Sequence, residues 1–150
     1  LLKVPVLGPV VLHSEVARFA RSLGLQLTHG VSILQAVDVS IQVIDQRAIR
    51  AQLQRLPEGL RQGAALSEQL RGLSLSSPLL VSAVQVGEES GRVGEALTEV
   101  AVFYERETER LLQILTTLLE PMLVVVVGLI VGFIVMAVLL PIFEFGAGTP

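Results

Sequence analysis

The sequence predicts an all-α protein, an antiparallel bundle of roughly six helices whose last helix continues into a C-terminal transmembrane span. Three observations support this prediction. Apolar residues recur at helical spacing, and no segment shows the sustained apolar–polar alternation of a half-buried strand. Short stretches rich in Gly, Pro and Ser separate the helical segments, and short connections favour antiparallel neighbours. The third observation is an uninterrupted apolar run near the C-terminus.

The apolar run covers residues 121–140, between Glu120 and Pro141, and contains no charged residue. At a rise of about 1.5 Å per residue, about twenty helical residues cross a hydrocarbon core that is ~30 Å thick. A buried core helix is the alternative, but in a short chain it would carry a polar stripe, which this run lacks. We therefore predict a transmembrane helix over 121–140.

Basic residues set the predicted orientation of this span. Arg106 and Arg110 lie on its N-terminal side, whereas 141–150 contains neither Lys nor Arg. The positive-inside rule therefore places residues 1–120, with a helical domain over 10–120, in the cytoplasm and the short tail outside it. The position of the apolar run near the C-terminus excludes a signal peptide.

Composition and motifs argue against several classes of function. A formal net charge of -3 disfavours a nucleic-acid partner, which would require a clustered basic face. The absence of Cys removes thiolate metal sites and thiol nucleophiles. His13 and His29 fall on opposite sides of a continuous helix and cannot share a metal through it. Because no phosphate-binding glycine loop or nucleophile elbow is present, we predict a protein that is not an enzyme and uses no cofactor.

The N-terminal segment is predicted to be an extended entry loop over 1–9, because Gly8 and Pro9 disfavour a helix there. Its loop-like start, with Leu1 in place of Met, suggests a fragment of a longer protein. An amphipathic helix follows and ends at Gly30, a natural stop in the left-handed conformation.

Capping residues predict where the next helices begin. Ser32 and Gln35 have the form of a capping box, in which each side chain accepts a backbone N–H. Asp45 can cap a third helix, and Pro57 within it predicts a kink or a break because proline removes a backbone hydrogen bond. Gly63 closes that segment.

Two further helices are predicted in the second half of the chain. A short helix over 66–70 precedes Gly72. Ser77 and Pro78 form a strong start signal, a capping hydroxyl followed by proline at the first helical position, for a helix that ends near Gly91. The last long helix begins after that turn and continues into the membrane.

The stretch Gly87-Glu88-Glu89-Ser90-Gly91 is the first candidate functional site. Two glycines around a carboxylate pair and a hydroxyl predict a sharp turn between helices with its side chains held close together. One interpretation is structural: the last glycine stops a helix, and the glutamates form a solvated corner. The other interpretation is a polar contact site for a partner or a neighbouring subunit.

The second candidate site crosses the predicted membrane boundary. One face of a continuous helix contains the positions Gln113, Thr117, Glu120, Val124, Gly128 and Gly132. The two glycines form a small-xxx-small pattern that lets helices approach closely, and Glu120, just before Pro121, favours a protein neighbour or water over lipid. Glycine is also frequent in membrane helices generally. We predict that this face contacts other membrane helices.

Taken together, these stretches resemble the type II secretion system F domain family, the platform proteins of type II secretion and type IV pilus assembly. The resemblance rests on Ala17-Arg18-Phe19-Ala20-Arg21-Ser22-Leu23-Gly24, Gly30-Val31-Ser32, Gly87-Glu88-Glu89-Ser90-Gly91, Leu119-Glu120-Pro121 and Leu140-Pro141-Ile142-Phe143. It covers nearly the whole chain in the right order. Two departures are Val93-Gly94, where a leucine and an acidic residue are more usual, and Pro57, which interrupts a helix that the family tends to continue.

The resemblance implies a helical cytoplasmic domain that occurs as two tandem copies, of which this chain matches the second copy plus the final span. It implies a scaffold in the bacterial inner membrane that couples a cytoplasmic assembly ATPase to the assembly of pilin-like subunits and to protein export. The implied partners are the lipid bilayer, the ATPase, other inner-membrane components, pilin-like subunits and further copies of the protein. The Gly87–Gly91 turn and Glu120-Pro121 are the signature positions, with an architectural role.

A membrane-anchored dimeric sensor or regulator is the alternative function. It would require a ligand pocket with convergent polar groups, whereas this sequence offers mainly amphipathic faces and acidic corners. A transporter or channel subunit would carry ionisable residues within the span, and 121–140 has none.

Overall fold

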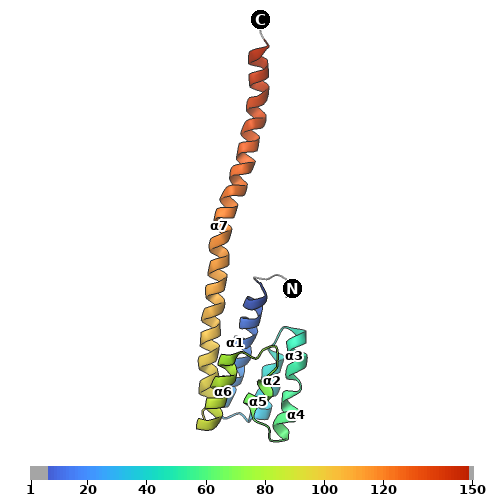
Figure 1. Ribbon diagram of the computed structural model, residues 1–150, viewed down its shortest axis with the longest axis vertical. Helices are drawn as coiled ribbons and strands as arrows, with labels where there is room; N and C mark the ends of the chain where they lie inside the picture. Colours follow the sequence, from blue (N-terminus) through green and yellow to red (C-terminus); the bar gives the residue numbers. More distant parts are fainter. Residues whose placement is uncertain (1–6, 149–150) are drawn as a thin grey trace. The chain divides into compact units, whose positions relative to one another are not determined.

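The computed structural model describes residues 7–148 and contains seven α-helices and no strand in that range (Figure 1). The helices are α1 (Leu7–Thr28), α2 (Ile33–Gln42), α3 (Arg47–Leu53), α4 (Leu56–Arg61), α5 (Leu66–Leu70), α6 (Pro78–Ser90) and α7 (Val93–Ala147). The chain divides into two compact units, Leu1–Arg110 and Leu111–Pro150. The predicted all-α fold class is confirmed.

Helix α1 begins two residues before Pro9, so the predicted entry loop is wrong for residues 7–9. Proline is tolerated in the first turn because the N–H groups there have no partner within the helix. Residues 1–6, the rest of the predicted loop, lie outside the described residues. The predicted end of the helix is confirmed, since Gly30 follows it with a φ of +83°.

The caps predicted for α2 and α3 are only partly correct. Ser32 is the N-cap of α2, but its side chain makes no capping bond and its hydroxyl instead donates to Oε1 of Gln35 at 3.2 Å. The predicted capping box is therefore wrong. The N-cap of α3 is Gln46 rather than Asp45, because the Asp45 carboxylate pairs with Arg18 of α1 instead.

Proline and glycine positions define the short helices as predicted. The segment around Pro57 divides into α3 and α4, and the proline lies buried in the first turn of α4. Gly63 follows α4 with a φ of +87°. Ser77 and Pro78 start α6, and the Ser77 hydroxyl accepts a hydrogen bond from the N–H of Leu80 at 3.1 Å. Helix α5 has the predicted bounds.

The core of the first unit draws on every helix in it. Its fully buried large side chains include Phe19, Leu23, Val37, Leu53, Leu56, Leu66, Leu70, Leu80 and Leu97. Burying one such side chain contributes roughly 1.5–3 kcal/mol. Helices α3, α4 and α5 have seven, six and five residues, too few to be stable in isolation, so tertiary packing maintains them.

In the second unit, the large apolar side chains between positions 122 and 140 are 42–76% exposed. Among the described residues, α7 is the one helix that is long and apolar enough to cross a membrane, and none of its apolar window is buried. This exposure argues against the alternative of a core helix. The helix contains both Pro121 and Pro141 without ending at either.

Candidate functional site

The Gly87–Gly91 stretch lies where α6 ends and α7 begins. Its first four residues form the last turn of α6, so the predicted five-residue turn is wrong and the connection consists of Gly91 and Arg92 alone. Gly91 has a φ of +72°, a left-handed conformation that glycine adopts without steric cost, which confirms it as the helix stop. The Arg92 N–H donates to the Gly87 carbonyl oxygen at 2.8 Å and closes the turn.

Glu88 connects the end of α6 to the start of α5. Its carboxylate accepts hydrogen bonds from the Leu66 N–H at 2.6 Å, the Ser67 hydroxyl at 2.6 Å and the Ser67 N–H at 3.4 Å. The N-cap position of α5 is Ala65, whose side chain has no acceptor, so Glu88 supplies one for the unpaired N–H groups of the first turn. The interpretation of both glutamates as a solvated corner is therefore wrong for Glu88.

Gly87 allows α7 to pass close to α6. It is buried, and a Cβ atom at this position would lie 2.8 Å from the Cα of Val93 and 3.2 Å from the Cβ of Ala96. The nearer atom belongs to the backbone and cannot move aside like a flexible side chain. The two glycines of the stretch thus have separate functions: Gly91 turns the chain, and Gly87 makes room for the returning helix.

Glu89 and Ser90 remain at the surface. The Ser90 hydroxyl donates to the Val86 carbonyl oxygen at 2.8 Å, and the Gln85 amide donates to Glu89 at 3.4 Å. A hollow of about 350 Å³ between α5 and α6 is lined by residues that include Glu68, Arg71, Glu88 and Glu89. Glu89 is therefore the exposed carboxylate of the Gly87–Gly91 stretch, whereas Glu88 is half-buried.

The residues predicted at the membrane boundary all lie on α7 and are exposed: Gln113, Thr117, Glu120, Pro121, Gly128 and Gly132. The Thr117 hydroxyl donates to the carbonyl oxygen of Gln113 at 2.9 Å. A Cβ atom at Gly128 or Gly132 would meet no atom within 4 Å. Both glycine positions of this face therefore have space for the close approach of another helix.

A close helix crossing that the sequence analysis did not identify lies between α1 and the first part of α7. A Cβ atom at Gly24 would lie 2.9 Å from the Thr98 hydroxyl oxygen, and one at Gly94 would lie 2.7 Å from the Thr28 hydroxyl oxygen. Each threonine hydroxyl donates to the carbonyl oxygen of the glycine one turn earlier, at 2.7 Å for Thr28 and 2.9 Å for Thr98. The sequence feature that could have indicated this crossing is the Gly-x-x-x-Thr pattern, which occurs on both helices.

A bidentate ion pair lies on the same two helices. The Arg21 guanidinium donates to the Glu105 carboxylate from Nε at 3.0 Å and from a terminal nitrogen at 2.6 Å. Hydrogen bonding to Glu105 raises the pKa of Arg21, and the coulombic attraction adds to this effect against the opposing cost of burial. The pair connects α1 with the first part of α7.

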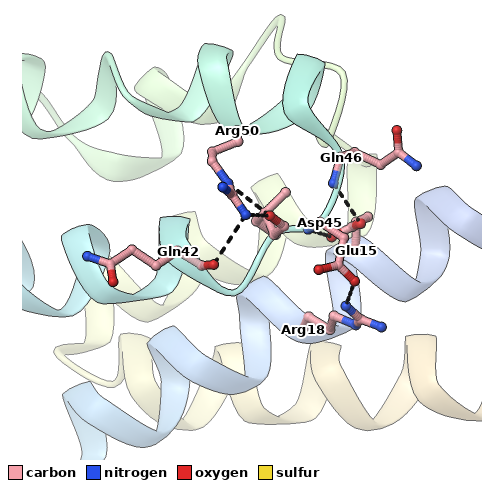
Figure 2. A network of polar contacts seen from close by, with 7 residues as sticks. Glu15, Arg18, Gln42, Asp45, Gln46 and Arg50 are labelled. Carbon is pink, nitrogen blue, oxygen red and sulfur yellow. Dashed lines mark hydrogen bonds and ion pairs between the residues drawn. The ribbon is translucent and has the colours of Figure 1, made fainter.

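Figure 2 shows a second polar network, where α1 meets the connection between α2 and α3. The buried Glu15 carboxylate accepts hydrogen bonds from the backbone N–H groups of Asp45 at 3.3 Å and Gln46 at 3.2 Å. Asp45 also pairs with Arg18. The sequence analysis did not identify this contact. The sequence feature that could have indicated it is an acidic residue on the apolar face of α1, three positions after Leu12.

Arg50 completes this network from α3. Its Nε donates to the Ile44 carbonyl oxygen at 2.9 Å, and a terminal nitrogen reaches the Gln42 carbonyl oxygen at 3.4 Å (Figure 2). These carbonyl groups lie at and beyond the end of α2, where a helix leaves carbonyl oxygens without partners and a cation is favourable. The network therefore fixes a connection rather than forming a binding site.

The two histidines do not form a metal site. The half-buried His13 ring lies 5.2 Å from the Tyr104 ring, and the exposed His29 follows α1, with its Nδ1 2.6 Å from the Leu25 carbonyl oxygen. Within residues 7–148, no group of three or more His, Asp or Glu side chains is placed to hold a metal ion.

Most of the chain matches a known protein family. A family model described as type II secretion system (T2SS), protein F, matches residues 19–141, which contain the crossing glycines, the Gly87–Gly91 stretch and the apolar run. The chain belongs to the type II secretion system protein F family. The resemblance predicted from the short motifs is thus confirmed.

Relatives of this chain are named for two kinds of machine. It is 37% identical over 146 residues to the type 4 fimbrial assembly protein PilC of Pseudomonas putida, a match that covers 97% of this chain and 36% of the relative. It is 35% identical to the type IV pilus assembly protein PilC of Thermus thermophilus, covering 95% and 36%. It is 31% identical to the type II secretion system protein F of Pseudomonas aeruginosa, covering 95% and 35%. The chain thus spans about a third of the length of these relatives.

Proposed function

We propose that this chain is part of an inner-membrane platform, a scaffold component of a type II secretion or type IV pilus assembly machine. The observation that carries the proposal is the family match over 19–141 together with an exposed apolar helix that can cross a membrane. In this proposal, residues 121–140 anchor the protein in the bilayer, residues 1–120 are cytoplasmic, and the C-terminal tail lies outside the cytoplasm.

The proposed activity is mechanical coupling rather than catalysis. A cytoplasmic assembly ATPase would favour one conformation of the helical domain over another. The bilayer-spanning helix would transmit this conformational change to pilin-like subunits as they are assembled. The proposal is supported by α7, whose residues belong both to the helical domain and to the apolar run, because a shift or rotation of a shared helix can pass between two sites. The exposed Glu89 is the proposed partner contact, and the Gln113–Gly132 face is the proposed contact with neighbouring membrane helices.

Photo-crosslinking in the full-length protein, within membranes that contain the complete machine, tests this proposal. Photo-reactive residues at Glu89, Glu95 and Gly128 should give adducts with the ATPase or another inner-membrane component from the first two, and with a membrane helix from the third. Gln35, an exposed residue of α2, serves as the control position. Adducts with lipid or with the same protein only, from all three positions, would overturn the platform and favour the dimeric sensor.

A further inference from the structure

An apolar groove lies between α6 and the first part of α7, entirely within the first unit. Its volume is about 480 Å³. Its walls include two rows of residues: Leu79, Ala83 and Val86 from α6, and Ala96, Val100 and Phe103 from α7. Both rows have the spacing i, i+4, i+7, so each follows one face of its helix. The groove therefore runs along the two helices rather than entering the core.

The groove presents large apolar side chains to solvent. Val86 is 61% exposed, Phe103 is 50% exposed and Leu79 is 39% exposed. The remaining lining includes the small residues Ser82 and Ala96, which leave room for a bulky side chain from outside. The two rows thus form a concave apolar surface that is open to solvent, the kind of surface into which the apolar face of a helix can pack.

The charge of the groove restricts what can bind there. Among the described residues that line it, Glu99 alone is charged. Glu95, one turn earlier on α7, pairs with Arg92 at 3.7 Å, whereas the residues that the structure describes give Glu99 no ion pair. A ligand that carries a cation beside Glu99 would complement this surface.

We propose that the α6–α7 groove binds an amphipathic helix of a partner protein, with apolar residues at i, i+4 and i+7 and a Lys or Arg beside Glu99. Helix-in-groove recognition uses apolar anchors at this spacing. The same groove on a second copy of the chain does not complement it. A two-fold contact between two such grooves would bring together surfaces that each present a carboxylate and no lining cation. This inference goes beyond the proposed platform function and does not depend on it.

The test uses the full chain in lipid nanodiscs and two synthetic fluorescein-labelled helical peptides of about 18 residues. Both peptides carry apolar residues at i, i+4 and i+7, and they differ only in a Lys or a Glu beside these anchors. Fluorescence anisotropy should show about three- to tenfold tighter binding of the Lys peptide. Glu99→Lys should reverse this preference. Equal binding of the two peptides to both proteins, or no binding above that of empty nanodiscs, would overturn the proposal.

A second variant tests the location of the site. Ala83→Trp should fill the groove and weaken binding of the Lys peptide by about tenfold or more. Ala51→Trp, at an exposed alanine of α3, is the matched control and should leave binding unchanged. Circular dichroism establishes that each variant is folded, and Glu99→Lys remains informative if Ala83→Trp does not fold. Undiminished binding to a folded Ala83→Trp variant would overturn the proposed location.

The chain has no native cysteine, so a single Val86→Cys variant can report on a second copy as the occupant. This variant is placed in nanodiscs that each hold two chains and is then treated with a short bismaleimide, and it should remain monomeric. The control variant Val39→Cys, on α2, should also remain monomeric. Efficient dimer formation through position 86 alone would overturn the proposal and identify the groove as an interface between copies of this chain.

Discussion

A Cβ atom at Gly24 would lie 3.0 Å from the carbonyl oxygen of Gly94, and a Cβ atom at Gly94 would lie 3.0 Å from the carbonyl oxygen of Gly24. This reciprocal relationship means that the backbones of α1 and α7 are in direct contact. The threonine that follows each glycine by one turn fills the space beside the contact. The crossing sets the position of the first part of α7 in the helical domain.

The first prediction concerns this crossing. Gly24→Ala or Gly94→Ala should destabilise the domain by about 1–3 kcal/mol, because a Cβ atom forces the two helix backbones apart. Thermal unfolding of the chain in detergent should show a fall in Tm of several degrees. Gly128→Ala is the matched control, a helical glycine with no atom near its Cβ position, and should leave the Tm unchanged or slightly higher. An unchanged Tm for both crossing variants would contradict the contact.

A second prediction concerns the cap that Glu88 provides for α5. Glu88→Ala should cost about 1–3 kcal/mol, because the N–H groups of Leu66 and Ser67 lose their acceptor. Hydrogen exchange should show faster exchange of these two amides, whereas Glu89→Ala should leave them protected.

A second-site substitution provides an independent check of that cap. Ala65→Asp places a carboxylate at the N-cap of α5 and should restore much of the protection lost in Glu88→Ala, since Asp is a preferred N-cap residue. If Ala65→Asp had no effect on the amides in the Glu88→Ala background, capping would not explain the contribution of Glu88.

The third prediction concerns Glu15 in the network of Figure 2. Glu15→Ala should destabilise the domain by about 1–3 kcal/mol, because two backbone N–H groups lose a buried acceptor. Asp45→Asn should cost less than about 1 kcal/mol, since its pair with Arg18 is largely exposed. Denaturant unfolding of the two variants measures this difference. If Asp45→Asn lowered the free energy of unfolding as much as Glu15→Ala, the greater contribution assigned to Glu15 would be contradicted.

A fourth prediction tests the proposed orientation in the membrane. Single-cysteine variants of the full-length protein, Ser90→Cys and Gly146→Cys, should react differently with a membrane-impermeant maleimide in cells whose outer membrane has been permeabilised. Position 146 should be labelled directly, and position 90 only after the inner membrane is opened. Direct labelling of position 90 with protection of position 146 would reverse the proposed topology.

The fifth prediction concerns the exposed face of α7 in the membrane. Photo-reactive residues at Val124 and Gly128 should crosslink to another membrane helix, because a Gly-x-x-x-Gly face permits close backbone approach. Phe133, 76% exposed and outside this set of positions, is the control for lipid contact. Lipid adducts alone from Val124 and Gly128 would contradict the predicted packing face.

The sequence by itself determined where most helices begin and end, and that one segment can cross a membrane. Gly30, Gly63 and Gly91 stop helices because each adopts a left-handed conformation that other residues disfavour. Ser77 with Pro78 starts α6 through bonds within its own first turn. These signals are local, since the capping or turning residue and the backbone that it affects lie a few residues apart. The apolar run is recognised as a candidate membrane span from its length and composition alone.

Only the tertiary structure decided which hydrogen bonds and backbone contacts connect these helices. Glu88 caps a helix that begins 22 residues earlier, and Glu15 binds backbone N–H groups 30 and 31 residues later. The capping box predicted at Ser32 did not form, although its sequence was suitable. Which donor meets which acceptor depends on where the packed core brings two distant segments together. A sequence pattern that spans a few residues does not specify which distant segment becomes the neighbour. The two Gly-x-x-x-Thr sequences mark Gly24 and Gly94 as alike, but only the fold shows that these two glycines meet each other.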